Sequence, residues 1–190
     1  MKMPTVGSID PESYALRLDP RHGLVMPWYT HGALDELASR DWSDKTVLEW
    51  GGGCSTLWWS RVAHRVYTVE TSPVWVDWIK AGAEPRGFCN ISVELRWPEP
   101  LDEYLKVPAG CRPDAVCIDG SERTACLEVA LALPRPLTIV FDNWQQDYVY
   151  VDEKAREMMA QYKLQGRLYV QLDHTNHEGR PWTTAIWDLT

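Results

Sequence analysis

From residue 45 to the end of the chain, short apolar runs alternate with longer amphipathic runs. This alternation is typical of strands joined by crossover helices, and it predicts an α/β fold with a mainly parallel sheet. The predicted strands are residues 46–50, 65–70, 90–95, 114–119 and 137–142. The predicted helices are residues 55–64, 73–82, 122–133 and 151–162.

The last two strand-like runs, residues 167–172 and 183–189, are separated by ten residues, DHTNHEGRPW. Parallel neighbours need a connection of about a dozen residues or more, usually a helix. These two runs are therefore predicted to be antiparallel neighbours, so that an otherwise parallel sheet contains one reversed strand at the end of the chain.

The 190 residues, 45% of them hydrophobic, are enough for a single globular domain with a continuous core. Within it we expect an N-terminal helical cover segment, residues 1–44, with a helix at residues 34–40. Residues 45–190 are expected to form the ligand-binding part of the same domain.

Charge and composition narrow the class of partner and the cellular compartment. The formal net charge of -8 disfavours nucleic acid and favours a small-molecule or protein partner, of which we expect a small-molecule substrate. The five cysteines show no C-x-x-C spacing, as expected for free thiols in a reducing compartment. The N-terminal residues lack an apolar core of signal-peptide length, and no uncharged stretch approaches the roughly 20 residues of a membrane span. We expect a cytoplasmic protein with no membrane contact. The sequence favours neither a monomer nor an oligomer.

Three consecutive glycines, Gly51 to Gly53, follow the first predicted strand. A glycine turn between a strand and a helix lets a ligand come close to the backbone, because no Cβ intervenes. The helix that follows, with Ser55 and Thr56 in its first turn, offers unpaired N–H groups to an anion. Tight turns also need glycine for conformational reasons alone, so both explanations stay open.

Glu70 strengthens the ligand interpretation, because it ends the second predicted strand 21 residues after Glu49. A carboxylate at that place can accept hydrogen bonds from the two hydroxyls of a ribose. Two kinds of nucleoside cofactor fit such a position, the dinucleotide NAD and a nucleoside that carries a positive charge. The dinucleotide fingerprint G-x-G-x-x-G is broken by Thr56, and Glu49 would face a pyrophosphate, so a cationic ligand is favoured over NAD.

At this point the sequence resembles class I S-adenosylmethionine-dependent methyltransferases. Their first motif, acid-x-Gly-x-Gly-x-Gly, is similar to the string from Glu49 to Ser55, with serine in place of the last glycine. The resemblance implies a Rossmann-like three-layer αβα sandwich, with a mostly parallel seven-stranded sheet and an antiparallel last strand. It also implies S-adenosylmethionine as cofactor. The cofactor-binding residues implied by the motif and its surroundings are Glu49, Gly51, Gly53, Ser55, Thr56, Glu70 and Asp119.

Asp119 ends the fourth predicted strand, and Asp142 and Asn143 end the fifth. Three hard oxygen donors at adjacent strand ends suit Mg²⁺, which can orient a hydroxyl acceptor and lower its pKa. The arrangement resembles catechol and caffeoyl-coenzyme A type O-methyltransferases, whose metal ligands match these three residues. The alternative is that the same side chains cap the segments that follow them.

For catalysis the sequence offers Asp119, Asp142 and His174. His174 and His177 lie between the last two predicted strands, at the edge that carries the carboxyl ends of the parallel strands. A general base and a solvated loop histidine are both consistent with that position. The favoured function is methyl transfer to a small molecule, at a hydroxyl oxygen if the metal is present. A cofactor-binding protein without chemistry and an NAD-dependent oxidoreductase are the alternatives.

Overall fold

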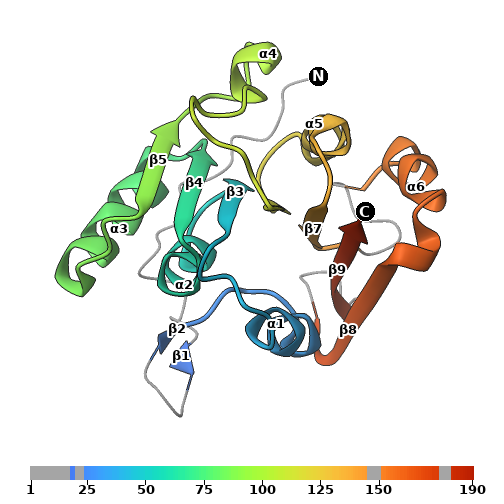
Figure 1. Cartoon of the computed structure of the whole chain (residues 1–190), viewed down its shortest axis with the longest axis horizontal. Coiled ribbons are helices and arrows are strands. Elements are labelled where there is room, and N and C mark those ends of the chain that lie inside the picture. Colours follow the sequence, from blue (N-terminus) through green and yellow to red (C-terminus); the bar gives the residue numbers. More distant parts are fainter. Residues whose placement is uncertain (1–17, 20–23, 145–150, 176–180) are drawn as a thin grey trace.

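A seven-stranded sheet forms the middle of the protein, with helices on both faces (Figure 1). The computed structural model describes residues 18–19, 24–144, 151–175 and 181–190. The strands of the sheet are β3 (Thr46–Trp50), β4 (Arg65–Glu70), β5 (Ile91–Leu95), β6 (Ala115–Ile118), β7 (Leu137–Asp142), β8 (Gly166–Thr175) and β9 (Pro181–Leu189). The helices are α1 (His31–Ala38), α2 (Cys54–Val62), α3 (Pro73–Ala83), α4 (Leu101–Tyr104), α5 (Arg123–Ala132) and α6 (Glu153–Ala160).

The strand order is β5-β4-β3-β6-β7-β9-β8. Strands β3 to β7 are parallel to one another, whereas β9 is antiparallel to both β7 and β8. The reversed last strand predicted from the sequence is confirmed. It lies inside the sheet, between β7 and β8, and not at its edge. The strand order reverses between β3 and β6, which is where open α/β sheets bind ligands.

Alternating side chains of β3 enter two separate hydrophobic clusters. Leu48 and Trp50 pack on the face covered by α5 and α6, and Val47 packs on the face covered by α1 and α2 (Figure 1). Both faces are buried, which explains why the parallel strands read as continuous apolar runs. The result is the three-layer αβα sandwich that the sequence analysis predicted.

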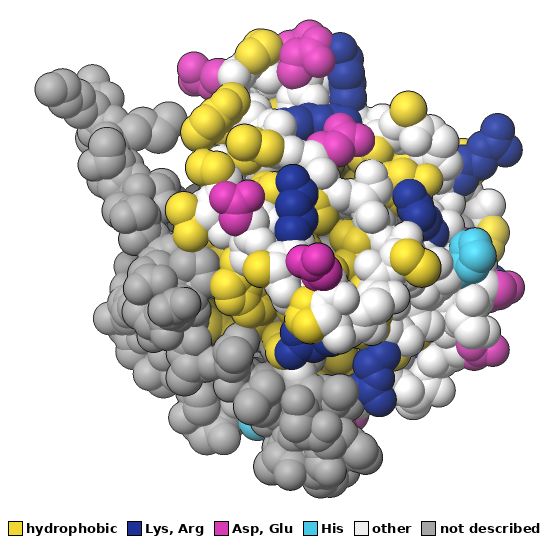
Figure 2. Space-filling view, turned by 90° about the vertical axis from the view of Figure 1, so that its left-hand side faces the viewer, with side chains coloured by type: hydrophobic (Ala, Val, Ile, Leu, Met, Phe, Trp, Pro, Cys, Tyr) yellow, Lys and Arg dark blue, Asp and Glu magenta, His cyan; other side chains and the backbone are white. Residues whose placement is uncertain are grey.

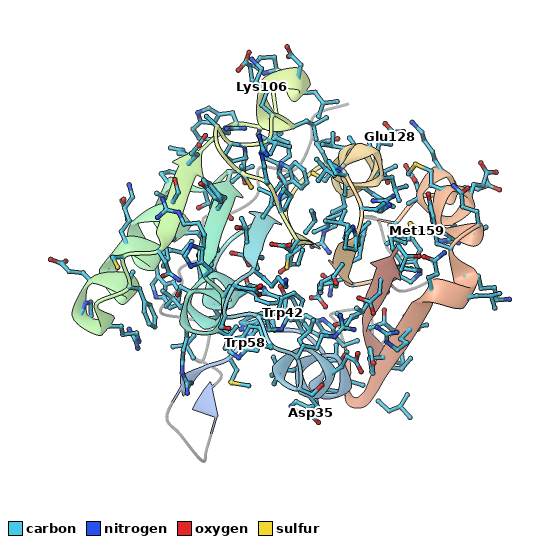
Figure 3. All side chains as sticks on the ribbon, viewed as in Figure 1. Asp35, Trp42, Trp58, Lys106, Glu128 and Met159 are labelled. Atoms are coloured by element: carbon cyan, nitrogen blue, oxygen red, sulfur yellow. The ribbon has the colours of Figure 1, made fainter. Side chains whose placement is uncertain are left out.

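Tryptophan fills much of the core under α1 and α2. Trp42 and Trp58 belong to the same buried cluster there, whereas Asp35 on α1 points away from the sheet (Figure 3). Trp59 is fully buried between them, with ring centroids 5.0 Å from Trp42 and 4.7 Å from Trp58 in edge-to-face geometry. These indoles therefore serve packing, as large aromatic side chains usually do.

The described part of the N-terminal segment belongs to the same core. Strands β1 (Leu18–Asp19) and β2 (Leu24–Val25) form a small separate antiparallel pair. Helix α1 packs against β8 and β9, and Leu34 and Leu37 join the cluster that contains Val47. None of the helices in the described ranges is long and apolar enough to cross a bilayer.

Candidate active site at the carboxyl edge of the sheet

The turn after β3 packs its backbone against the turn after β6. Gly51 has φ +93°, and a Cβ on it would lie 2.4 Å from the backbone nitrogen of Gly120. That nitrogen donates a hydrogen bond of 2.7 Å to the carbonyl of Trp50. Gly51 is therefore required by backbone conformation and by this close contact, whatever ligand the turn receives.

The other two glycines differ in what surrounds them. A Cβ on Gly52 would lie 2.4 Å from the methyl carbon of Thr68, so Gly52 is also fixed by packing. A Cβ on Gly53 would meet only the ring of Trp75, at an ordinary 3.5 Å. Two of these glycines, Gly51 and Gly53, were predicted to bind the cofactor. Gly51 packs against the turn after β6, whereas Gly53 has space around its Cα.

The carboxylate of Glu70, at the end of β4, accepts a hydrogen bond from the backbone of the glycine turn. Its Oε2 accepts a 2.7 Å hydrogen bond from the Gly52 backbone N–H, and its Oε1 accepts 2.8 Å bonds from the N–H groups of Thr71 and Ser72. Burial raises the pKa of Glu70, and these three bonds oppose the rise. The Thr71 hydroxyl adds a longer bond of 3.4 Å to Oε1. Oε2 accepts only the Gly52 bond from the described residues, so its second acceptor position remains for a ligand hydroxyl.

Glu49 lies under the turn and is fully buried. Its Oε2 accepts a 2.9 Å hydrogen bond from the Thr68 hydroxyl, and its Oε1 has no partner among the described residues. Burial raises the pKa of Glu49 to about 7, although the hydroxyls of Thr56, Ser55 and Thr68 act against the shift. A positive charge that comes near such a desolvated carboxyl group stabilises its ionised form.

Ser55 and Thr56 open α2, as predicted, but both side chains are buried. The Thr56 hydroxyl accepts a 3.1 Å hydrogen bond from the Gly53 N–H, which fixes the end of the turn. The sequence predicted these hydroxyls as ligand contacts. Thr56 serves the turn itself, and the ligand role of both residues stays a prediction.

Asp119, Asp142 and Asn143 do gather at the ends of β6 and β7, around a side chain that the sequence analysis did not single out. Arg123, only 6% exposed, donates to the Asp119 carboxylate at 3.0 Å and to the Asn143 side-chain oxygen at 3.1 Å. It also donates to the backbone carbonyl of Asp142, at 2.6 Å. A guanidinium therefore lies where the metal was predicted.

The carboxylate of Asp142 is 1% exposed and points toward β9. Its Oδ1 accepts a 2.6 Å hydrogen bond from the Thr184 hydroxyl, and its Oδ2 accepts a 3.2 Å bond from the indole of Trp182. Burial, followed by the negative charge of Asp119, raises the pKa of Asp142 to about 7. Asp142 is thus enclosed by protein groups, which conflicts with its predicted contact to an acceptor.

The three predicted ligands do not fit a divalent cation while Arg123 is in place. Two of them, Asp119 and Asn143, already share their side-chain oxygens with a buried positive charge, and a second cation would be repelled by it. Within the described ranges, no three acidic, histidine or cysteine side chains are grouped as metal ligands. The Mg²⁺ prediction is therefore not supported. The capping alternative also fails for Asp119, because α5 has no side-chain cap.

The predicted histidines are placed only in part. His174 lies near the carboxyl end of β8, at the same edge as the ends of β6 and β7, but its side chain lies outside what the structure describes. His177 lies outside the described residues altogether. The catalytic role of His174 therefore stays a prediction.

Several solved structures share this fold. TomG, an O-methyltransferase from Streptomyces achromogenes involved in tomaymycin synthesis and solved in complex with SAM, matches with a TM-score of 0.61 at 18% identity, covering 84% of this chain and 79% of that chain. Cofactor-bound Rv0187 from MTB matches with a TM-score of 0.55 at 23% identity, covering 76% and 72%. An rRNA methylase from Streptococcus thermophilus matches with a TM-score of 0.51 at 14% identity, covering 84% and 96%.

No protein-family model matches the chain, and no curated protein sequence matches it. The strand order and these structural likenesses nevertheless define the class: the chain has the Rossmann-like fold of class I S-adenosylmethionine-dependent methyltransferases. The fold predicted from the residues around the glycine turn is confirmed.

Proposed function

We propose that the protein is an S-adenosylmethionine-dependent methyltransferase that methylates a hydroxyl oxygen of a small molecule, with a carboxylate of the protein and not a metal ion receiving the hydroxyl proton. The observation that carries the proposal is the buried carboxyl group of Glu49 directly before the glycine turn, with an Oε1 that no described residue satisfies. A ligand that brings ammonium and sulfonium charges to this turn lowers the cost of ionising Glu49, whereas a pyrophosphate raises it.

Glu70 supports the nucleoside part of the proposal. Three backbone N–H groups hold its carboxylate in a fixed orientation at the end of β4, next to the turn. A rigid acceptor positioned in advance loses little entropy when a ribose hydroxyl binds to it. Glu49 and Glu70 thus provide one site for the charged end of the cofactor and another for its ribose.

When bound, S-adenosylmethionine supplies a methyl group that its sulfonium has already activated. The protein has to position the acceptor and take its proton. Asp119 is best placed for the second task, because its side chain is 33% exposed at the end of β6. The guanidinium of Arg123 donates a hydrogen bond to Oδ1 of Asp119. No described residue donates to Oδ2, so that atom can accept a hydrogen bond from the hydroxyl of the methyl acceptor. Burial raises the pKa of Asp119, while Arg123 opposes the shift, so it is a stronger base than a free aspartate.

The acceptor side is expected near the start of β9. Trp182 bonds to Asp142 and packs edge-to-face against Trp28, with ring centroids 6.2 Å apart. Both rings are partly exposed, and they provide an aromatic wall for a small acceptor. His174, at the end of the neighbouring β8, is the second candidate base.

A nucleic acid acceptor is disfavoured by charge. The fold alone does not decide the matter, because both an O-methyltransferase and an rRNA methylase have it. The net charge of -8, however, opposes attraction to phosphates. On the side that carries β5 and α3, Lys and Arg are interspersed with Asp and Glu (Figure 2).

The test is a thermal-shift series with S-adenosylmethionine, its demethylated product and NAD, each with and without EDTA. A ligand specific for the folded state adds about 2.7 kcal/mol of stability at a concentration of 100 times its Kd. We expect both methionine-derived ligands to stabilise the protein, equally with EDTA, and NAD to have no effect. Stabilisation by NAD alone would overturn the cofactor proposal. Binding without methyl transfer to any of a broad set of phenols, alcohols and amines would favour the non-catalytic alternative.

A further inference from the structure

Arg123 makes an unusually complete set of contacts for a buried arginine. Its Nε donates to the Gly120 carbonyl at 3.0 Å, and its Nη2 donates to the carbonyl and the carboxylate of Asp119 at 2.8 and 3.0 Å. Its Nη1 donates to the Asp142 carbonyl at 2.6 Å and to the Asn143 side chain at 3.1 Å. These five oxygens equal the five N–H donors of a guanidinium in number.

The oxygens come from two separate strand ends, one after β6 and one after β7. Both turns contain a non-glycine residue in the left-handed region, Glu122 at φ +50° and Asn143 at φ +57°. Such residues persist when the surrounding structure fixes them. The guanidinium of Arg123 lies between the two turns and connects them.

We propose that Arg123 is the resident cation of this oxygen cluster and occupies the place that a divalent metal takes where such oxygens are vacant. A guanidinium supplies a positive charge, and its planar fork satisfies acceptors on both turns at once. The cluster is therefore complete without Mg²⁺.

The functional consequence rests on the proposed methyl transfer. Arg123 would be a positioning residue, because it orients the Asp119 carboxylate and keeps the end of β6 at a fixed distance from the end of β7. In the proposed mechanism Asp119 takes the proton of the methyl acceptor. Loss of Arg123 would therefore lower kcat more than the affinity for S-adenosylmethionine.

The experiment compares the wild-type chain with Arg123→Ala, Arg123→Lys and a control, Arg112→Ala, at an exposed arginine. Thermal unfolding is measured in EDTA, in millimolar Mg²⁺ or Ca²⁺, and in millimolar guanidinium chloride, far below denaturing concentrations. Removing one partner of a buried charge pair should lower the Tm of Arg123→Ala by roughly 6–12 °C. Guanidinium or the divalent ions should restore part of that loss, while wild type and Arg112→Ala do not respond.

Arg123→Lys keeps a point charge but lacks the fork, so we expect an intermediate Tm and a reduced kcat, with S-adenosylmethionine still bound. This variant, together with the wild-type response to Mg²⁺, decides the question even if Arg123→Ala does not fold. A wild-type Tm that rises with Mg²⁺ and falls with EDTA would overturn the proposal. So would an Arg123→Ala protein that responds to neither guanidinium nor metal. Absence of methyl transfer in wild type would defeat the proposed function and leave this unfolding test intact.

Discussion

At the scale of single residues, Glu49 links burial to a measurable pH dependence. Its carboxyl group is fully buried, and its pKa is raised to about 7, so the folded chain keeps a proton that the unfolded chain releases near the ordinary value of 4.5. The folded state binds more protons between these two values, so stability falls as pH rises from about 4.5 to 7. The penalty is fully present above pH 7.

Glu49→Gln should remove that part of the pH dependence. A shift of this size corresponds to a loss of about 3 kcal/mol between acidic and mildly alkaline pH in the wild-type chain. Urea unfolding of the ligand-free protein on both sides of the transition measures it, and the variant should show a clearly smaller fall. Asp142, whose pKa is also raised to about 7, contributes to the fall that remains, as do Glu70 and Asp119, whose pKa values burial raises as well. An identical fall in wild type and variant would show that Glu49 is not the group responsible.

The sequence placed Glu49, Glu70 and Asp119 correctly at strand ends, because strand ends can be predicted from apolar runs. It did not predict Arg123, whose importance depends on acceptors 19 and 20 positions away, at the end of β7 and directly after it. Four of its partners are backbone or amide oxygens, which carry no compositional signal. The enclosure of Asp142 was missed for the same reason, since both of its donors lie on β9.

At the scale of secondary-structure elements, Asp188 on β9 connects the segment after α1 with β7 and β8. Arg40, two residues after the end of α1, donates to both of its oxygens, at 2.7 and 2.9 Å, and Thr138 on β7 donates at 2.8 Å. Arg167 on β8 forms an ion pair with the same carboxylate. Burial would raise the pKa of Asp188, but the hydrogen bonds from Arg40, Arg167 and Thr138 outweigh it and hold the pKa at about 2.

Asp188→Asn should therefore destabilise the protein at neutral pH. The side chain is 37% exposed, so solvent screening limits the loss to about 1 kcal/mol. The stabilisation is present above the ordinary aspartate pKa and disappears as the pH falls toward about 2, so wild type and variant should converge in acid. Chemical unfolding at neutral pH and near pH 3 tests this. A difference that widens in acid would contradict the assignment.

Periodicity predicted the ends of several strands more closely than the start of α1. The predicted strands 46–50, 65–70 and 137–142 agree with β3, β4 and β7 at both ends. Helix α1 begins at His31, three residues before the predicted start, because tertiary contacts hold its first turn. The backbone N–H of His31 donates to Gln171 on β8, at 3.0 Å, a contact that no local pattern predicts.

At the scale of the whole molecule, one buried hydroxyl connects the N-terminal segment to the active-site edge. The Thr184 hydroxyl on β9 donates to Asp142 at 2.6 Å and accepts from the Thr30 backbone N–H at 2.9 Å. All three residues are at most 2% exposed. The described part of residues 1–44 is thereby joined to the ends of β7 and β9, close to the proposed acceptor side.

Thr184→Val keeps the shape of this side chain but removes both hydrogen bonds. Two buried polar groups then lack a partner, which costs about 1–3 kcal/mol each. We expect a loss of roughly 2–5 kcal/mol in the free energy of unfolding, measured by urea denaturation, whereas Thr190→Val at the exposed end of the chain should have almost no effect. A stability equal to wild type would show that the link is not formed in solution.

The architecture could be predicted from the sequence because the helix–strand alternation and the short final connection leave few topologies. The proximity of the glycine turn and Glu70 could be predicted, because they belong to consecutive elements. The proposed acceptor side instead joins Trp28, Trp182 and the ends of β6 and β7. Contacts between elements so far apart in sequence require the tertiary structure.

The most direct test of the account is calorimetric titration of S-adenosylmethionine into the full chain, in EDTA, with Glu70→Ala and the exposed control Asp77→Ala. We predict one site per chain in wild type and control. Affinity should be at least about tenfold weaker in Glu70→Ala, because the Gly52 N–H loses its acceptor and the ribose loses its partner. Binding of NAD in place of S-adenosylmethionine, or unchanged affinity in Glu70→Ala, would contradict it.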